Sequence, residues 1–411
     1  MSTDISKRIL FLDAYYEPEK TAYSHLEHDL VEMLVSHGFD ITIICPQPTR
    51  AVTKKEHKNF IKEENAFDGH VLIKRFKCFG ERKTVILRAI RYFVAYVKTF
   101  AFAKRENDVD VIFCNSTPPI QGLLAAKLKL YYLKKHNRNV PFVYNLQDLF
   151  PDSMVNAGIA NKKSFVYKVG NKITKKVYQN ANQIITISNS FREELIKRGV
   201  DENKISVVYN WIDLEKVKPI ERSNNPLFDK LCIKRDDRIV CYAGNFGYAQ
   251  DLDAIVKLAN CFENESLIFI VFGGGSLFDV YSQKMNCMKN VFVFPLMPQS
   301  MISYVYSLAD IYLISCKKGL GDSSFPSKIW SILACNKFVV GLFDEDSEVA
   351  HFLEDNNCGQ VVNQDDVNRQ LDAIKNGLSA KGDFRFVAQK YGNKENATYC
   401  YLNAFLNCFD K

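Results

Sequence analysis

Long apolar runs, paired cysteines and linker-like segments are all missing from this chain of 411 residues. The most apolar stretch, 85–103, contains Arg88, Arg91 and Lys98, which argues against a membrane-spanning helix there. The twelve cysteines include no CxxC pair, so reduced core cysteines are expected rather than a zinc site or disulfides. No Pro/Gly/Ser-rich tract or solenoid-length repeat occurs, which excludes a long disordered linker and a repeat protein.

Acidic residues are scarce in the first 200 residues, where lysine and arginine outnumber them, and are slightly in excess in the remainder. The formal net charge is +7, and the hydrophobic content of 47% is ordinary for a soluble globular protein. The apolar run at the N-terminus is too short for a signal peptide. The length predicts two or three domains, and the opposite charges of the two halves suggest different roles.

Short β-branched runs alternate with amphipathic helical patterns along the chain, and the alternation starts again after about residue 215. This order predicts an α/β protein with two doubly wound, Rossmann-like domains facing across a cleft. We expect an N-terminal domain at 1–215, a C-terminal domain at 216–394, and a helix at 395–411 that crosses back to the first domain. Ligands of such sheets bind at the carboxyl ends of the strands.

Serine hydroxyls and one lysine, but no acid, occupy residues 323–331, SSFPSKIWS. Pro326 suits a first helical turn, and the neighbouring serines suit the N-cap. The helix dipole disfavours Lys328 there by about 0.3–1 kcal/mol unless an anion shares the site. The segment therefore predicts a phosphate site, the alternative being a solvated lysine on a capped helix.

Two glycine-containing loops follow predicted strands. Gly244 and Gly247 lie in CYAGNFGYAQDLD, and three glycines end the strand at 272–276, FGGGS. Glycine lets a backbone turn tightly and approach a flat or anionic group closely. Plain turns are the alternative for both loops.

Several motifs occur in the order found in glycosyltransferase family 4. They are FLDAYYEPEKTAYSHLEHDLVEML, YNLQDLFPDS, KISVVYNWID, CYAGNFGYAQDLD, FPSKIWSILACNKFVV and SEVAHFLEDNNCGQVV. The chain resembles this family over nearly its whole length, and within it the bacterial N-acetylfucosamine transferases. The resemblance implies the GT-B fold and a glycosyl transfer that retains the anomeric configuration and needs neither a metal ion nor a cofactor. It further implies transfer from a UDP-sugar to a lipid-diphosphate-linked acceptor in capsule, O-antigen or exopolysaccharide synthesis.

The resemblance places the donor on the C-terminal domain and the acceptor on the N-terminal one. The residues it implies for the diphosphate are Gly244, Asn245, Gly247, Ser327 and Lys328. Those it implies for the base are Gly273, Gly274, Phe294 and Met297.

Two glutamates that many family members carry are replaced here by Ser323 and Ser331. Ser331 or Glu348 would then hold the ribose, and Asp322 would take the task of the first glutamate. Asn245 stands where many members have an arginine, which leaves Lys328 as the only strong cation for the diphosphate.

Acceptor contacts are expected in two N-terminal loops. Asp148 is the candidate for orienting the acceptor hydroxyl, with a helix N-cap as the alternative role, and Asp152 comes second. Gln147 stands where relatives often have histidine, and glutamine cannot act as a general base. The loop after the first strand offers four more candidates, Tyr16, Glu17, Lys20 and Tyr23.

Basic residues cluster at 71–105 and 161–176. On the predicted helix, Arg88, Arg91, Lys98 and Arg105 would line one face, directed at an anionic membrane surface. The apolar stripe of that helix is expected to face the protein interior; it comprises Ile86, Ile90, Phe93, Val97 and Phe100. We expect a protein attached peripherally to the inner face of the cell membrane. The chain shows no nucleic-acid-binding signature.

Two other functions remain open at this point. A non-catalytic GT-B partner subunit would explain the two serines. A UDP-sugar 2-epimerase would need acid/base side chains, which a chain with seven histidines does not obviously supply.

Overall fold

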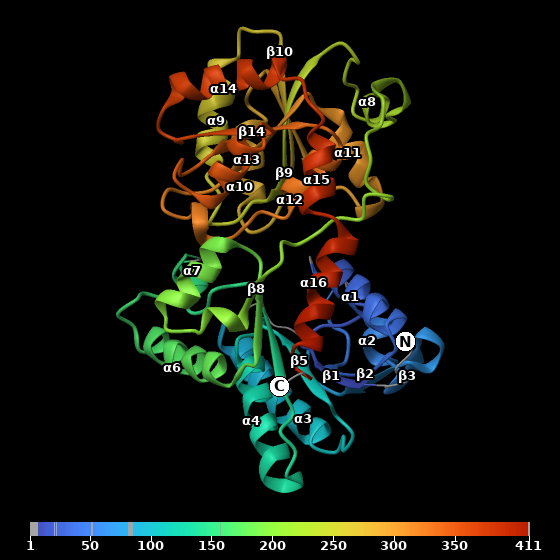
Figure 1. Ribbon diagram of the computed structural model, residues 1–411. Helices are drawn as coiled ribbons and strands as arrows, with labels where there is room; N and C mark the ends of the chain where they lie inside the picture. Colours follow the sequence, from blue (N-terminus) through green and yellow to red (C-terminus); the bar gives the residue numbers. More distant parts are fainter. Residues whose placement is uncertain are drawn as a thin grey trace. The chain divides into compact units, whose positions relative to one another are not determined.

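The computed structural model describes residues 7–409 except 20, 22, 51, 81–84 and 157, and only the backbone of residues 85 and 86. The chain forms two compact units, coloured along the sequence in Figure 1. Unit 1 contains Met1–Met154, Ala160–Val208 and Ala397–Lys411, and unit 2 contains Val155–Ile159 and Tyr209–Asn396.

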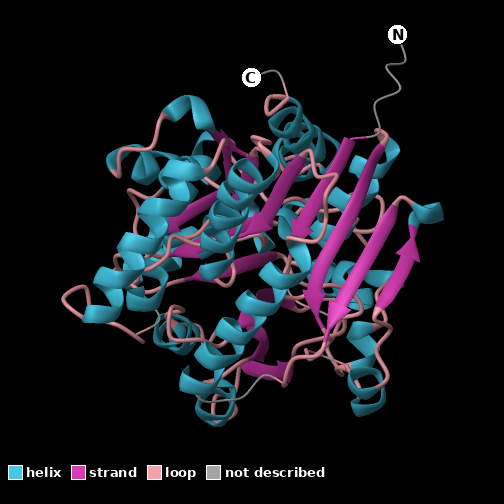
Figure 2. Ribbon diagram, turned by 90° about the horizontal axis from the view of Figure 1, so that it is seen from below, coloured by secondary structure: helices cyan, strands magenta, loops and turns pink. Residues whose placement is uncertain are grey.

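Unit 1 is built on an eight-stranded sheet of order β3-β4-β2-β1-β5-β6-β7-β8, in which only the β3–β4 pair is antiparallel. Figure 2 shows long strands of this sheet side by side, with helices packed against them. The strands are β1 Lys7–Leu12, β2 Phe39–Pro46, β3 Glu63–Ala66, β4 Val71–Phe76, β5 Val111–Asn115, β6 Phe142–Leu146, β7 Gln183–Thr186 and β8 Ile205–Val207. The chain runs outward from β1 in one direction and then from β5 in the other, so the strand order reverses between β1 and β5.

The helices of unit 1 connect and cover these strands. They are α1 Ser24–Ser36, α2 Lys54–Lys58, α3 Val85–Ala103, α4 Ile120–His136, α6 Phe165–Asn180 and α7 Asn189–Lys197, with short 3₁₀ turns at Phe67–Gly69 and Glu202–Lys204. Helix α5, Asp152–Asn156, begins in unit 1 and its last two residues belong to unit 2. Their caps follow the sequence: Ser164 accepts from the backbone N–H of Tyr167 at 3.2 Å at the start of α6.

Helix α16, Lys394–Leu406, returns from the end of the chain to unit 1 and lies beside α1 in Figure 1. The ring of Phe405 lies 5.5 Å from that of Phe113, centroid to centroid. The Tyr401 hydroxyl donates to Asn145 Oδ1 at 2.9 Å. The predicted helix crossing back to the first domain is therefore confirmed.

Unit 2 has a six-stranded parallel sheet of order β11-β10-β9-β12-β13-β14. Its strands are β9 Arg238–Asn245, β10 Leu267–Gly274, β11 Val291–Pro295, β12 Ile311–Ser315, β13 Phe338–Leu342 and β14 Gly359–Val362. Its helices are α8 Leu227–Lys230, α9 Leu252–Cys261, α10 Phe278–Met285, α11 Ile302–Leu308, α12 Lys328–Ala334, α13 Glu348–Asp355, α14 Val367–Ser379 and α15 Phe384–Tyr391, with 3₁₀ turns at Arg222–Asn224, Gln299–Met301 and Gly321–Ser323. Here the strand order reverses between β9 and β12, so both predicted doubly wound domains are confirmed.

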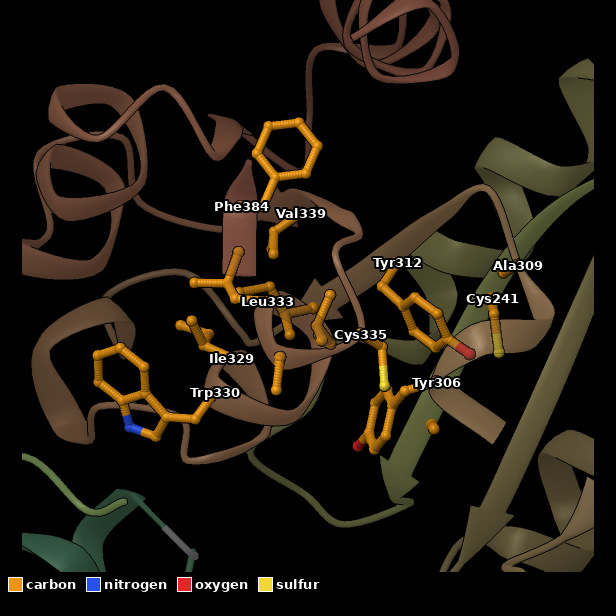
Figure 3. Close-up of a cluster of buried hydrophobic side chains, with 14 of the residues drawn as sticks. Cys241, Tyr306, Ala309, Tyr312, Ile329, Trp330, Leu333, Cys335, Val339 and Phe384 are labelled. Atoms are coloured by element: carbon orange, nitrogen blue, oxygen red, sulfur yellow. The ribbon is translucent and has the colours of Figure 1, made fainter. Parts of the chain in front are cut away.

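Helix α12 is anchored in the core of unit 2. Its residues from Ile329 to Ala334 are buried, and Figure 3 shows Trp330, Ile329 and Leu333 within this core. The indole of Trp330 stacks on Phe325 with an interplanar angle of 16°. Gly392 leaves no room for a side chain against that indole. This packing fixes the position of the helix's first residue, Lys328.

Candidate active site

In unit 2 the strand order reverses beside the ends of β9 and β12, where Gly244 and Ser315 lie. The loop after β9 leads to α9, whose N-cap Asp251 accepts from the N–H of Ala254 at 3.0 Å. The Ser315 hydroxyl donates to the Asp251 carbonyl at 2.7 Å and so joins the end of β12 to the start of α9. Ligands of doubly wound sheets bind at such a reversal.

Lys328 and Gly244 meet at this place although 83 residues separate them in the sequence. A methyl group on Gly244 would fall 2.5 Å from the Lys328 ammonium, so the glycine makes room for it. The same ammonium lies 4.6 Å from the ring centroid of Tyr242, whose hydroxyl donates to the Asn245 carbonyl at 3.0 Å. The predicted proximity of glycine loop and helix start is thus observed.

The Lys328 ammonium is buried, which is unfavourable for its charged form. Burial lowers its pKa to about 8, because taking an ammonium out of water disfavours its charge. Among the residues that the structure describes, no carboxylate lies within ion-pair distance of it. A lysine held this way is stabilised by an arriving anion.

The two glycine loops also pack on each other. A side chain on Gly275 would strike the Asn245 side chain, and one on Gly273 would strike the ring of Phe246. Gly275 has φ of +126°, a conformation that favours glycine. Gly247 donates from its backbone N–H to Gln250 Oε1 at 3.1 Å. Gly273 therefore has a packing reason, and its predicted contact with a base stays a prediction.

The serines of the 323–331 segment differ in their surroundings. Ser323 donates to the Leu320 carbonyl at 2.6 Å within its own turn. Ser327 is the N-cap residue of α12, but its side chain makes no capping bond, so the predicted serine cap is wrong there. Ser331 is buried on α12. Nothing in these contacts supplies the charge that the two missing glutamates would carry.

Asp322 and Glu348 are joined. The backbone N–H of Glu348 donates to Asp322 Oδ1 at 2.9 Å, so Asp322 stabilises the start of α13. Glu348 Oε1 accepts from the Tyr209 hydroxyl at 2.9 Å. Both acids thus have structural partners, and their proposed donor roles stay predictions.

The two residues expected near the base, Phe294 and Met297, pack against the core of unit 2. Phe294 lies 5.7 Å from Phe272, ring centroid to ring centroid. Next to them, the backbone N–H of Leu296 donates to the Gly273 carbonyl at 2.9 Å, and a side chain on Gly274 would touch Leu296. The structure therefore brings β10 and β11 ends together as expected.

In unit 1, Asp148 lies directly after β6 and is exposed. Its Oδ2 accepts from the Thr117 hydroxyl at 3.4 Å, and partial desolvation by the surrounding loops raises its pKa. Asp152 instead accepts from Arg198 at 2.5 Å and from the Tyr167 hydroxyl at 2.9 Å. Although burial opposes it, these bonds lower the pKa of Asp152. Asp152 is thus engaged in structure, while Asp148 keeps an accessible carboxylate.

The other acceptor candidates differ in accessibility. Tyr16 is buried in unit 1, which speaks against direct contact with an acceptor. Glu17 is exposed and pairs with His28 Nδ1 at 3.1 Å. Lys20 lies outside the described residues. The Tyr23 hydroxyl accepts from Asn145 inside the unit.

Sequence reasoning missed a buried acid pair at the reversal point of unit 1. Asp13 follows β1 and Glu27 lies in the first turn of α1; both are buried. Burial raises the pKa of both carboxyls, because taking a carboxylate out of water disfavours its charge. Asn115 Nδ2 donates to Glu27 Oε1 at 2.5 Å. The sequence feature that could have indicated this pair is Asp13, the acid at the end of the apolar run RILFLD.

The membrane-facing arrangement predicted for α3 is wrong in part. Arg91 is 1% exposed and forms the buried face of the helix with Ala95 and Thr99. Conversely, three members of the apolar stripe expected inside are outside: Ile90 is 47%, Phe93 60% and Val97 49% exposed. The interior at this place is lined by polar groups, so it accepts a guanidinium rather than an aliphatic chain.

The remaining members of that prediction lie as follows. Phe100 is partly buried, and the Ile86 side chain lies outside the described residues. Arg88 is partly buried, and Arg105 is exposed. Lys98 is exposed and donates to the Lys77 carbonyl at 2.7 Å. Over the described ranges, no helix has the length and apolar character needed to cross a bilayer. In the same part of the chain, no three His, Cys, Asp or Glu side chains gather as metal ligands.

Comparison with protein families assigns both halves of the chain. Residues 27–216 match Glycosyltransferase Family 4, and residues 223–395 match Glycosyl transferases group 1. The chain belongs to glycosyltransferase family 4. The recognised family is thereby confirmed, whereas its N-acetylfucosamine branch stays a proposal.

Two curated relatives are similar over much of this family 4 chain. A probable glycosyltransferase WbjE of Pseudomonas aeruginosa is 22% identical over 65% of this chain and 66% of its own length. The putative colanic acid biosynthesis glycosyl transferase WcaI of Escherichia coli K12 is 22% identical over 80% of this chain and 81% of its own.

Solved structures share the fold of this family 4 chain. Sucrose-phosphate synthase from Thermosynechococcus elongatus superposes with a TM-score of 0.72 at 14% identity, covering 98% of this chain and 99% of that one. Anabaena Alr3699/HepE in complex with UDP gives 0.67 at 13% identity, covering 97% and 99%. The GT-B fold is therefore established.

Proposed function

We propose that the protein is a metal-independent, retaining glycosyltransferase that moves a sugar from a UDP-sugar to a lipid-diphosphate-linked acceptor in bacterial polysaccharide synthesis. An N-acetylated hexosamine or deoxyhexosamine is the proposed sugar, from the resemblance to the fucosamine transferases. The observation that carries the proposal is the Lys328 ammonium, which lies beside Gly244 without a carboxylate partner among the described residues. A diphosphate would neutralise it.

Transfer needs the leaving diphosphate stabilised as negative charge develops on it. Lys328 supplies one positive charge, and the backbone of the Gly244–Gly247 loop can approach the phosphate oxygens closely. Asp148, the exposed carboxylate after β6, is proposed to orient the acceptor hydroxyl. The choice of UDP is supported by the similar Anabaena structure, which holds UDP. The polysaccharide role is supported by the relative named for colanic acid biosynthesis.

The donor part is tested by thermal-shift titration with UDP, GDP and dTDP. A nucleotide at 100 times its dissociation constant should raise stability by about 2.7 kcal/mol. We expect UDP to shift the wild type and the Lys289→Ala variant, which removes an exposed lysine of unit 2. Lys328→Ala should lose the shift. If no nucleotide shifts the wild type, the non-catalytic partner-subunit alternative replaces this proposal.

The membrane part rests on one surface of unit 1. Helix α3 packs against α4 and α4 against α6. Large apolar side chains of these helices are exposed: Leu87, Ile90, Phe93, Val97, Leu130, Leu133, Phe165, Val166 and Val169. Residues 161–176 add six lysines and no acid. Apolar side chains flanked by lysines suit an anionic membrane surface.

Co-sedimentation with phosphatidylglycerol vesicles tests this surface, with phosphatidylcholine vesicles for comparison. Replacing Ile90 and Phe93 by serine should weaken binding about tenfold or more, because each buried side chain contributes about 1.5–3 kcal/mol. Phe386→Ser is the matched control, since Phe386 is 58% exposed but lies in unit 2. Equal binding of all three proteins would refute the assigned surface.

A further inference from the structure

A polar cavity of about 600 Å³ lies in unit 2, and its lining includes neither Lys328 nor Gly244. Most of its lining residues lie between 363 and 369, after β14, and the others follow β12 and β13. The carboxyl ends of these strands belong to the edge at which doubly wound sheets bind ligands. The volume falls in the range of about 300–1,000 Å³ that small-molecule sites occupy. The unit 2 cavity is therefore a second candidate site on this unit.

Hydrogen bonds hold the walls of the unit 2 cavity in place. Arg369 Nη1 donates to both carboxylate oxygens of Glu345, at 2.7 and 2.8 Å. The Asn363 backbone N–H donates to the same carboxylate at 2.9 Å. The loop after β12 is held by Asp344, which accepts from the Gly319 backbone N–H at 2.8 Å. A ligand therefore meets walls that are already ordered, which lowers the entropic cost of binding.

The lining of the unit 2 cavity disfavours several ligand classes. It carries two basic and three acidic side chains, from Lys318, Arg369, Glu345, Asp365 and Asp366. An anion therefore meets one negative charge in excess, and because Lys318 and Arg369 pair with two of the acids, this excess is also small for a cation. Among the described residues of the lining, Val367 alone is apolar, so a lipid chain has little to pack against. These properties favour a neutral, polar ligand.

Hydroxyl groups suit this lining, because the unit 2 cavity presents both donors and acceptors. The carboxylate of Asp365 only accepts, the ammonium of Lys318 only donates, and the amide of Asn368 does both. Lys318 Nζ and Asp365 Oδ2 are 3.6 Å apart, and their side chains are 68% and 69% exposed. Such an exposed pair is weak, so both groups stay available to a ligand. The neighbouring hydroxyls of a sugar ring, each able to donate and to accept, match this arrangement.

The segment 363–369 also contains a buried amide. Gln364 is 5% exposed, and neither its Oε1 nor its Nε2 has a hydrogen-bond partner among the described residues. Its sequence neighbours Asn363 and Asp365 both line the unit 2 cavity. Buried amides are normally bonded to protein groups or to ordered water. This segment therefore has hydrogen-bonding capacity that the described part of the chain does not use.

We propose that the unit 2 cavity binds a neutral glycan, as a carbohydrate site separate from the donor site at Lys328. The inference goes beyond the proposed function, which requires one sugar, the donor's, on this unit. It rests on that function only for the source of the glycan, since an enzyme that extends polysaccharides meets neutral sugar chains as acceptor and as product. The bonds offered are exposed, so the affinity is expected to be weak.

The test is saturation-transfer NMR and calorimetric titration, with maltotriose and N,N′,N″-triacetylchitotriose as neutral probes. The wild type should bind at least one of them in the millimolar range. Asp365→Ala should weaken this binding about tenfold, as expected for one or two lost hydrogen bonds. Asn368→Trp should abolish it, because an indole at this exposed position of the lining fills the cavity. Asp236→Ala is the matched control, since Asp236 is an exposed acid of unit 2 outside the lining.

Three results would overturn the inference. They are failure of both trisaccharides to bind the wild type, unchanged binding by Asn368→Trp, and loss of binding in Lys328→Ala instead of in the cavity variants, which would place the sugar in the donor site. The UDP thermal shift of every variant is measured in parallel. If UDP shifts the wild type and neither trisaccharide binds, only this inference fails. If UDP shifts none of the proteins while Asn368→Trp still abolishes trisaccharide binding, the donor proposal fails and this site stands.

Discussion

At the strand-order reversal of unit 1 two carboxylic acids, Asp13 and Glu27, are buried together, whereas at the same place in unit 2 the buried charge is the Lys328 ammonium. Asn115 donates to Glu27, and burial raises the pKa of both acids, which favours their uncharged forms. Gly244 and the face of Tyr242 lie beside the ammonium, and within the described residues no carboxylate forms an ion pair with it. The two reversal points therefore differ in their chemistry: two buried acids with raised pKa lie at the first, and a buried ammonium with a lowered pKa lies at the second.

The largest effect is expected from removing the buried positive charge of Lys328. Lys328→Met, which keeps much of the volume without the charge, should lower donor turnover about a hundredfold, because it deletes the cation nearest the proposed leaving group. The measurement is release of nucleotide from the UDP-sugar by purified protein. Turnover within a few-fold of wild type would show that Lys328 is not the diphosphate contact.

A smaller effect is expected from displacing the ammonium rather than deleting it. Gly244→Ala places a methyl group 2.5 Å from the Lys328 Nζ, so the side chain must move. UDP affinity should fall about tenfold, the cost of a misplaced charge-assisted bond. Gly80→Ala is the control, because a methyl group there meets no atom of the described residues within 4 Å. Calorimetric titration of both variants distinguishes displacement from a general glycine effect.

Because the pKa of Lys328 is lowered to about 8, UDP affinity is expected to depend on pH. The free protein loses this proton near pH 8, and a bound diphosphate holds it to higher pH, so UDP binding takes up a proton above pH 8. UDP affinity should therefore fall about threefold between pH 7.5 and 8.5. A Lys328→Arg variant that still binds UDP should lose this dependence, since arginine stays charged. A flat wild-type profile would contradict the assignment.

The smallest effect concerns the acid pair of unit 1. Burial raises the pKa of Glu27 in the folded protein. Below about pH 4.3 the carboxyl is protonated in both the folded and the unfolded protein, and as the pH rises the unfolded chain loses this proton first. Stability should thus decline towards the folded pKa. Glu27→Gln keeps an oxygen that accepts from Asn115 but has no proton that titrates. The fall of the thermal unfolding midpoint with rising pH should therefore be smaller in this variant, by about 2–4 °C. Glu193→Gln, at an exposed position, should leave it unchanged.

Much of this architecture could be predicted because it depends on local pattern. The alternation of strand and helix predicted both sheets, and the helix expected at 395–411 is α16, Lys394–Leu406. That Lys328 and Gly244 share one site was implied by the resemblance to the family, and the rule that ligands bind at the carboxyl ends of the strands agrees with it. The predictions that were wrong depended on which residues, distant in sequence, lie next to a side chain in the fold. Arg91 is buried because Tyr15 and Thr49, distant in sequence, offer it acceptors, and no helical periodicity reveals that.

Helix α16 also has a consequence for the order in which the protein is made. It comes after the whole of unit 2 in the sequence, yet its Phe405 ring packs on Phe39 and Phe113, and its Tyr401 bonds to Asn145. While the ribosome is still translating residues 209–396, the first-made sheet therefore exposes the apolar surface that this helix will cover. The nascent chain must keep that surface from aggregating until α16 emerges, and only then can the first unit complete its core.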